Sequence, residues 1–210
     1  MATSEITVEV LCDKDTLFKL LKDKGFSYRG ELLIDDYYYT HVPMSGDVEF
    51  RELLSNSFLL RNLRCNDKKS KAKSVMYHRL VYKKKEYDIN DRVISERKIS
   101  TELPDTRVAN EIFQQAGMTN WCVKNVTAYD YRRKDLQVLV QEVEGLGLFL
   151  EMEQPESITG TADEVLDKLV EILNNIEIPV GPDYHVSIAY LLHLKKNKKV
   201  TRGFRPIVIG

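Results

Sequence analysis

Apolar and polar residues alternate along most of the chain, and this restricts it to folds that are rich in β-strands. In residues 6–12, one face of the predicted strand carries Ile6, Val8, Val10 and Cys12. The other face carries Thr7, Glu9 and Leu11. A period of two is typical of a half-buried strand. Further strands are predicted at residues 28–42, 58–64, 75–87, 93–100, 121–131, 136–143 and 148–153.

Predicted helices separate some of these strands. Residues 13–25, 106–116 and 161–174 have apolar stripes with the period of a helix, and a last short helix is predicted at 187–194. Thr161 with Glu164 three residues later predicts a capping box. Seven or eight strands with many hairpin-like neighbours favour an α+β fold, in which an antiparallel sheet closes into an eight-stranded barrel. We expect one domain at residues 1–194 and a basic tail at 195–210.

The composition narrows the class of partner and the location. The formal net charge is −1, so no general attraction to nucleic acid or to an anionic membrane is expected. No apolar run is long enough for a spanning helix, and the first residues lack the pattern of a signal peptide. The three cysteines, Cys12, Cys65 and Cys122, show no disulfide or metal spacing. These features predict a cytoplasmic protein, as a monomer or homodimer.

Charges of opposite sign are segregated along the chain. Residues 68–85 are basic, whereas residues 142–156 are acidic. Two solvated strand faces would explain this pattern without any function. Inside a barrel, however, charged side chains are costly unless they are paired, solvated or bound to a ligand. A barrel with both signs on its inner face is therefore predicted to be a binding tunnel.

Two groups of residues are candidates for the chemistry. Glu151 and Glu153 lie two apart on one strand face, which is suited to a hard divalent cation such as Mg²⁺. Arg61, Lys83 and Lys124 lie on three other predicted strands and match phosphate oxygens. The alternative, that all of these are ordinary solvated side chains, stays open on spacing alone.

Several motifs resemble the CYTH superfamily, the triphosphate tunnel metalloenzymes. The run Val143-Glu-Gly-Leu-Gly-Leu-Phe-Leu-Glu-Met-Glu153 resembles its V-x-G-L-G-x-F-x-E-x-E strand. Other resemblances follow in the family's order and cover about residues 5–194: Asp36-Tyr-Tyr-Tyr39, Leu60-Arg61, Leu80-Val-Tyr-Lys83, Lys124 with Tyr129, and Ser187-Ile-Ala-Tyr-Leu-Leu192.

The family comprises class IV adenylate cyclases, thiamine triphosphatases and inorganic triphosphatases. The resemblance implies an eight-stranded tunnel that holds a triphosphate, with Mg²⁺ or Mn²⁺ as cofactor. The implied substrate-binding residues are Arg61, Arg64, Lys83, Lys124 and Tyr129. The implied metal ligands are Glu9, Glu96, Glu151 and Glu153, and the implied catalytic residues are Glu9, Lys83 and Glu151. We expect hydrolysis of a nucleotide, organic or inorganic triphosphate, ahead of cyclisation of ATP to cyclic AMP and pyrophosphate.

Some positions depart from the family's pattern. The family's first strand reads E-x-E-x-K, but here the candidates are Glu5-Ile-Thr7-Val-Glu9 and Thr7-Val-Glu9-Val-Leu11. Gln141 replaces an aspartate, and Val126 replaces an arginine. These changes remove groups that would stabilise a transition state. They imply an altered activity or, as the alternative, a module that binds a polyphosphate or nucleotide without turnover. A protein-interaction domain that uses only the scaffold is a third possibility.

Overall fold

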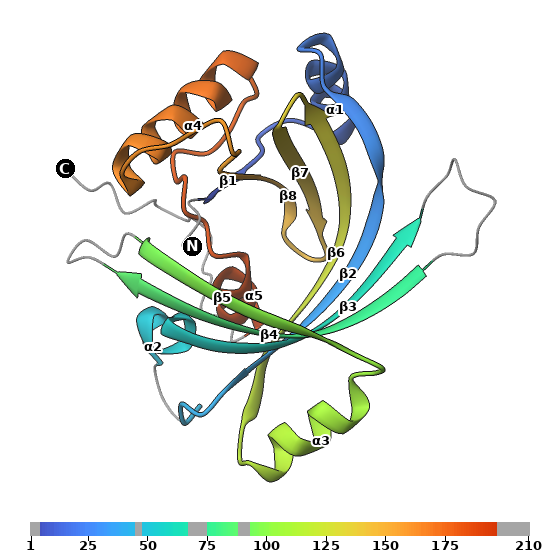
Figure 1. The fold of residues 1–210 in the computed structure, drawn as a ribbon, viewed down its shortest axis with the longest axis vertical. Coiled ribbons are helices and arrows are strands. Elements are labelled where there is room, and N and C mark those ends of the chain that lie inside the picture. The colour runs from blue at the N-terminus through green and yellow to red at the C-terminus, as the bar shows by residue number, and fades with distance from the viewer. Residues whose placement is uncertain (1–4, 45–47, 67–74, 88–92, 197–210) are drawn as a thin grey trace.

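A computed structural model describes residues 5–44, 48–66, 75–87 and 93–196 (Figure 1), with residues 50, 66 and 93–95 described by their backbone alone. The eight strands are β1 (Glu5–Glu9), β2 (Ser27–Thr40), β3 (Asn56–Asn66), β4 (Val75–Tyr87), β5 (Val93–Leu103), β6 (Thr119–Arg133), β7 (Leu136–Val143) and β8 (Gly147–Glu153). The five helices are α1 (Lys14–Asp23), α2 (Phe50–Ser55), α3 (Arg107–Gln115), α4 (Ala162–Ile176) and α5 (Ile188–Lys196).

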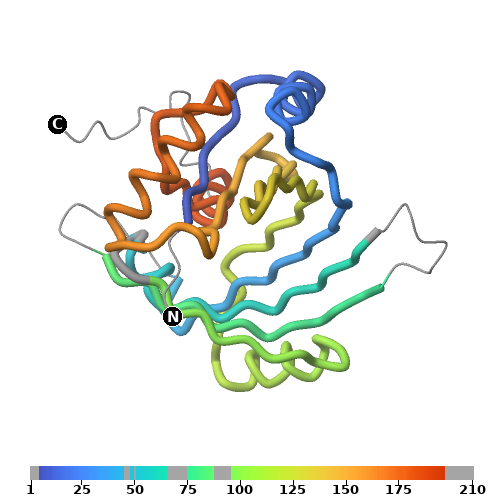
Figure 2. The backbone as a smooth tube through the Cα atoms, turned by 45° about the horizontal axis from the view of Figure 1, so that its top comes forward, coloured from blue at the N-terminus to red at the C-terminus, as the bar shows by residue number. Residues whose placement is uncertain are grey.

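All eight strands form one antiparallel sheet in the order β1-β8-β7-β6-β2-β3-β4-β5. The sheet curls strongly around its inner face, as Figures 1 and 2 show. Register shifts between β2 and β6, at Tyr28/Gly30 and at Tyr38/Tyr39, are bulges of the kind that bend long strands. The predicted strand-rich antiparallel fold is confirmed.

The predicted closure of the barrel is wrong. The edge strands β1 and β5 share no backbone ladder among the described residues, so the sheet is open. One reason is that the second edge of β1 is already occupied, because Thr7 forms a parallel bridge with His185 and exchanges backbone hydrogen bonds with Tyr184 and Val186. The other is that α5 packs inside the curve, where its residues Ile188 and Leu191 contact Ile34 and Val126 of the inner face.

Two sets of helices cover the outer face. The helices α1 and α4 cover β1, β7 and β8, where Val8, Leu150 and Leu169 are fully buried. The helix α3 covers the other half of the sheet through Phe113, which packs against Leu60. The predicted alternation in β1 is confirmed, because its apolar face is buried in this core and Thr7 points the other way.

The helix boundaries follow local chemistry. Thr161 and Glu164 form the predicted capping box at the start of α4, with both reciprocal hydrogen bonds present. Gly25, with φ of 83°, allows the chain to turn after α1. The helix α2 is an addition to the predicted helices. No helix in the described part of the chain is long and apolar enough to cross a membrane. The predicted tail lies mostly outside the described residues, and α5 includes its first two lysines.

Candidate functional site

A row of charged residues crosses the middle of the inner face. Lys124 of β6 and Arg61 of β3 both pair in register with Asp36 of β2, which lies between them. Asp36 is fully buried, and it accepts hydrogen bonds from Arg61 Nε at 2.6 Å and Arg61 Nη2 at 2.8 Å. Lys124 Nζ lies 3.4 Å from the second carboxylate oxygen of Asp36. One buried carboxylate therefore holds two predicted phosphate-binding residues.

The electrostatics of this row keep its members ionised. Burial raises the pKa of Asp36, but the neighbouring charges of Arg61 and Lys124 outweigh it, and the pKa is lowered overall. Burial lowers the pKa of Arg61 and of Lys124, and nearby anionic groups, including Asp36 and Glu151, raise both overall. Glu151 of β8 points to the same side of the sheet, because it follows Leu150, which is buried in the outer core.

A second ionic group lies on β4 and β5. Lys83 Nζ is 3.2 Å from Glu96 Oε1, and Lys85 Nζ is 2.9 Å from Glu96 Oε2. Burial lowers the pKa of Lys83, but Glu5, Glu96 and Glu151 raise it overall. Glu96, which was predicted as a metal ligand, therefore forms ion pairs with two lysines.

The stability of the protein is expected to depend on pH through Glu96. Burial raises the pKa of Glu96, but Lys83 and Lys85 lower it from 4.5 to about 2. A carboxyl with a lowered folded-state pKa contributes its full stabilisation above pH 4.5 and loses it as the pH falls towards 2. Urea unfolding of the wild type and of Glu96→Gln should show a difference in unfolding free energy that shrinks through this window. A difference that stays constant down to pH 2 would contradict this assignment.

Three carboxylates meet on β1 and β8. Glu5, Glu151 and Glu153 each offer an oxygen within 4.8 Å of the others. The register explains their meeting, because Glu5 pairs with Glu153, and Thr7 pairs with Glu151. Gln141 of β7 donates from Nε2 to Glu151 Oε2 at 2.6 Å. Glu5 joins the predicted pair in place of Glu9, which is exposed at the other end of β1 and lies outside this cluster.

One ionic contact links the two edges of the open sheet. Lys85 Nζ of β4 lies 3.8 Å from Glu5 Oε1 of β1, although these strands lie near opposite ends of the strand order. The carboxylate cluster and the lysines of β4 therefore face each other on the inner side of the curled sheet. Side chains, rather than a backbone ladder, bring the edges together.

Two of the predicted substrate-binding residues, Arg64 and Tyr129, do not point to the inner face. In an uninterrupted strand, residues separated by an odd number point to opposite faces. Arg64 is three residues from Arg61, and Tyr129 is five residues from Lys124. Tyr129 packs on Phe18 of α1 and donates to Glu142 at 2.9 Å. Neither residue is retained in the candidate site.

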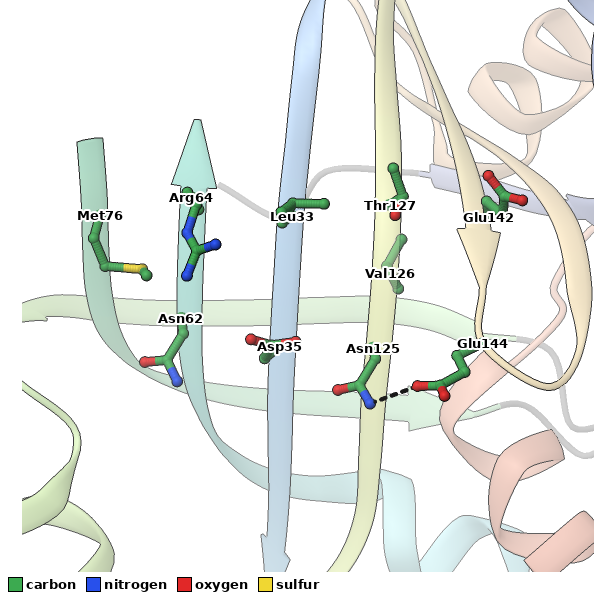
Figure 3. A pocket seen from close by; sticks show the side chains of 10 residues that line it. All are labelled: Leu33, Asp35, Asn62, Arg64, Met76, Asn125, Val126, Thr127, Glu142 and Glu144. Atoms are coloured by element: carbon green, nitrogen blue, oxygen red, sulfur yellow. Dashed lines mark hydrogen bonds between the residues drawn. The ribbon is translucent and has the colours of Figure 1, made fainter. Parts of the chain in front are cut away.

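Arg64 lies instead beside a pocket on the outer face of the sheet (Figure 3). The pocket has a volume of about 360 Å³. It lies on β2, β3 and β6 in the stretch between α1 and α3, and its polar side chains include Asp35, Asn62 and Asn125. Asn125 donates to Glu144 at 2.9 Å at its rim. The sheet therefore separates this pocket from the charged inner face.

Comparisons with known proteins agree with this architecture. No protein-family model matches the sequence. The chain is 27% identical over 178 residues to the protein named "Putative adenylate cyclase MJ0240" of Methanocaldococcus jannaschii, and the match covers 85% of this chain and 91% of that protein.

Two solved structures have similar folds. The PH1819 protein of Pyrococcus horikoshii has a TM-score of 0.66 and 21% identity, over 92% of this chain and 99% of that one. A protein of Vibrio parahaemolyticus described as a "putative adenylate cyclase" has a TM-score of 0.64 and 13% identity, over 91% and 98%. The chain thus shares the fold of both proteins along almost its whole described length, and it is similar in sequence to a protein named "Putative adenylate cyclase".

Proposed function

We propose that the inner face of the curled sheet binds a triphosphate together with Mg²⁺ or Mn²⁺, and that the protein hydrolyses this compound. The observation that carries the proposal is the presence of two groups of opposite charge on the inner face of the curled sheet. Three cations, the buried Lys124 and the half-buried Arg61 and Lys83, lie on the same face of the sheet as the cluster of three carboxylates. A polyanion with its counter-cation is the ligand that satisfies both groups.

The cationic side chains are held in place for phosphate contacts. Asp36 engages two nitrogens of the Arg61 fork, which leaves Nη1 and the remaining hydrogens available for phosphate oxygens. Lys83 and Lys124 offer point charges at either side of Arg61 in the strand order. Preorganised cations of this kind stabilise the charge that spreads over the phosphoryl oxygens during transfer.

The residues of the carboxylate cluster fit a divalent cation. Glu5, Glu151 and Glu153 are hard oxygen donors, as Mg²⁺ and Mn²⁺ require, and they come from two paired strands. When bound, the cation supplies charge neutralisation to the phosphate oxygens. The two ionic groups and the cluster together contain four cationic and five anionic side chains. Because this set is net negative, triphosphate binding is expected to require the cation.

Membership of the CYTH superfamily is part of this proposal. Its support is the order of the motifs along the chain, the sequence similarity to a protein named "Putative adenylate cyclase", and the shared fold. The same names favour a second candidate function, the conversion of ATP to cyclic AMP and pyrophosphate. Hydrolysis ranks first because it needs only the phosphate and cation contacts described above, whereas cyclisation also needs a nucleoside placed so that its 3′ hydroxyl can attack.

The test is a panel of ATP, thiamine triphosphate and tripolyphosphate, with and without Mn²⁺. We expect release of phosphate, and thermal stabilisation by at least one compound only when Mn²⁺ is present. Cyclic AMP with pyrophosphate would identify the second function instead. Stabilisation without any product would identify a binding module. No stabilisation and no product with any compound would contradict the proposal.

Two arginines of β3 provide a matched pair of variants. Arg61→Gln removes a cation from the inner face, and Arg64→Gln makes the same change on the outer face. Stabilisation by the triphosphate should be lost in Arg61→Gln and kept in Arg64→Gln. Equal losses in the two variants would show that the ligand does not bind inside the curl.

A further inference from the structure

Gln141 has a buried polar atom without a partner. Its side chain is on the inner face of β7 and is 2% exposed. Nε2 donates to Glu151, but Oε1 is buried and has no hydrogen-bond partner among the described residues. An unsatisfied buried carbonyl oxygen costs about 1–3 kcal/mol, so natural sites usually supply a partner for it.

This oxygen lies beside the carboxylate cluster. The amide geometry separates Oε1 from Nε2 by roughly 2.3 Å, so Oε1 is within about 5 Å of Glu151 Oε2. Gln141 pairs in register with Phe149, two residues before Glu151 on the same face. Side-chain amide oxygens belong to the same class of hard donors as carboxylates. Oxygen donors from β1, β7 and β8 therefore lie in the same part of the inner face.

We propose that Gln141 is a neutral fourth ligand of the cation, beside Glu5, Glu151 and Glu153, and that this site holds one divalent ion. The inference rests on the proposed function, which assigns a cation to the cluster. Two other carboxylates of the inner face are already paired with cations. Asp36 is held by Arg61 and Lys124, and Glu96 is held by Lys83 and Lys85.

The experiment measures Mn²⁺ binding to the full chain without any triphosphate. Electron paramagnetic resonance counts the bound ions, and calorimetry gives the affinity. The wild type should bind one Mn²⁺. Gln141→Met keeps nearly the same volume but has no oxygen donor, and it should bind one Mn²⁺ about tenfold more weakly, at the lower end of the range for lost supporting groups. Gln137→Met, four residues away on the same strand, is the matched control and should keep the wild-type affinity.

A second variant keeps the proposal testable if Gln141→Met does not fold. Gln141→Glu places a carboxylate against Glu151, so the cation-free protein should melt at a lower temperature than the wild type. Mn²⁺ should then raise its melting temperature by more than it raises that of the wild type. An unchanged affinity in Gln141→Met, a smaller Mn²⁺ shift in Gln141→Glu, or two ions per chain would overturn the inference. No Mn²⁺ bound to the wild type would instead overturn the proposed function.

Discussion

Replacing Asp36 by asparagine is expected to lower the free energy of unfolding by about 3–5 kcal/mol, the usual cost of removing one member of a buried ionic group. Asp36 is fully buried and is the shared counter-ion of Arg61 and Lys124. The substitution leaves both cations on the inner face without this partner. Urea denaturation of the two proteins at pH 7 measures the difference.

Neighbouring positions provide the controls for this prediction. Asp35→Asn makes the same chemical change one residue earlier, where the side chain faces the outer pocket, and should change the stability by no more than about 0.5 kcal/mol. Adding Arg61→Met and Lys124→Met to Asp36→Asn should recover most of the lost free energy of unfolding, because these changes remove the two cations that the first substitution leaves unpaired. If Asp35→Asn and Asp36→Asn cost the same, Asp36 does not have this role.

The faces of the strands follow from local sequence. Period two determines which residues share a strand face with Arg61, Lys83, Lys124 and Glu151, and the structure brings all four to the inner face. The same rule already separates Arg64 from Arg61 and Tyr129 from Lys124, because their spacings are odd. The family resemblance suggested these two residues, and a parity count along each strand would have removed them.

Long-range pairing explains what the sequence could not predict. The role of Asp36 depends on β2 lying between β3 and β6, which are distant in sequence, and on the register of both ladders. Glu5 replaces Glu9 in the cluster because β1 pairs with β8 in a register that places Glu5 opposite Glu153. The open edge depends on α5, from the end of the chain, packing inside the curl. None of these features has a local signal.

Replacing Glu151 by glutamine is expected to weaken Mn²⁺ binding by at least about 100-fold. Loss of an outer partner of a metal ligand typically costs about 10–100-fold in affinity, so loss of a charged ligand should reach the top of that range or exceed it. Glu151 belongs to the cluster, and its Oε2 also accepts a hydrogen bond from Gln141 Nε2 at 2.6 Å. Calorimetry with Mn²⁺ measures the affinity directly.

The fold should survive this change, because a glutamine side chain has the same size and still offers an oxygen to Gln141 Nε2. Glu156→Gln, at an exposed position just beyond β8, should keep the wild-type affinity and thus controls for the loss of one negative charge. Triphosphate-dependent stabilisation in Mn²⁺ should disappear together with the cation affinity. If Glu151→Gln binds Mn²⁺ as tightly as Glu156→Gln, the cation does not occupy this cluster, and the charges of the inner face must be neutralised in another way.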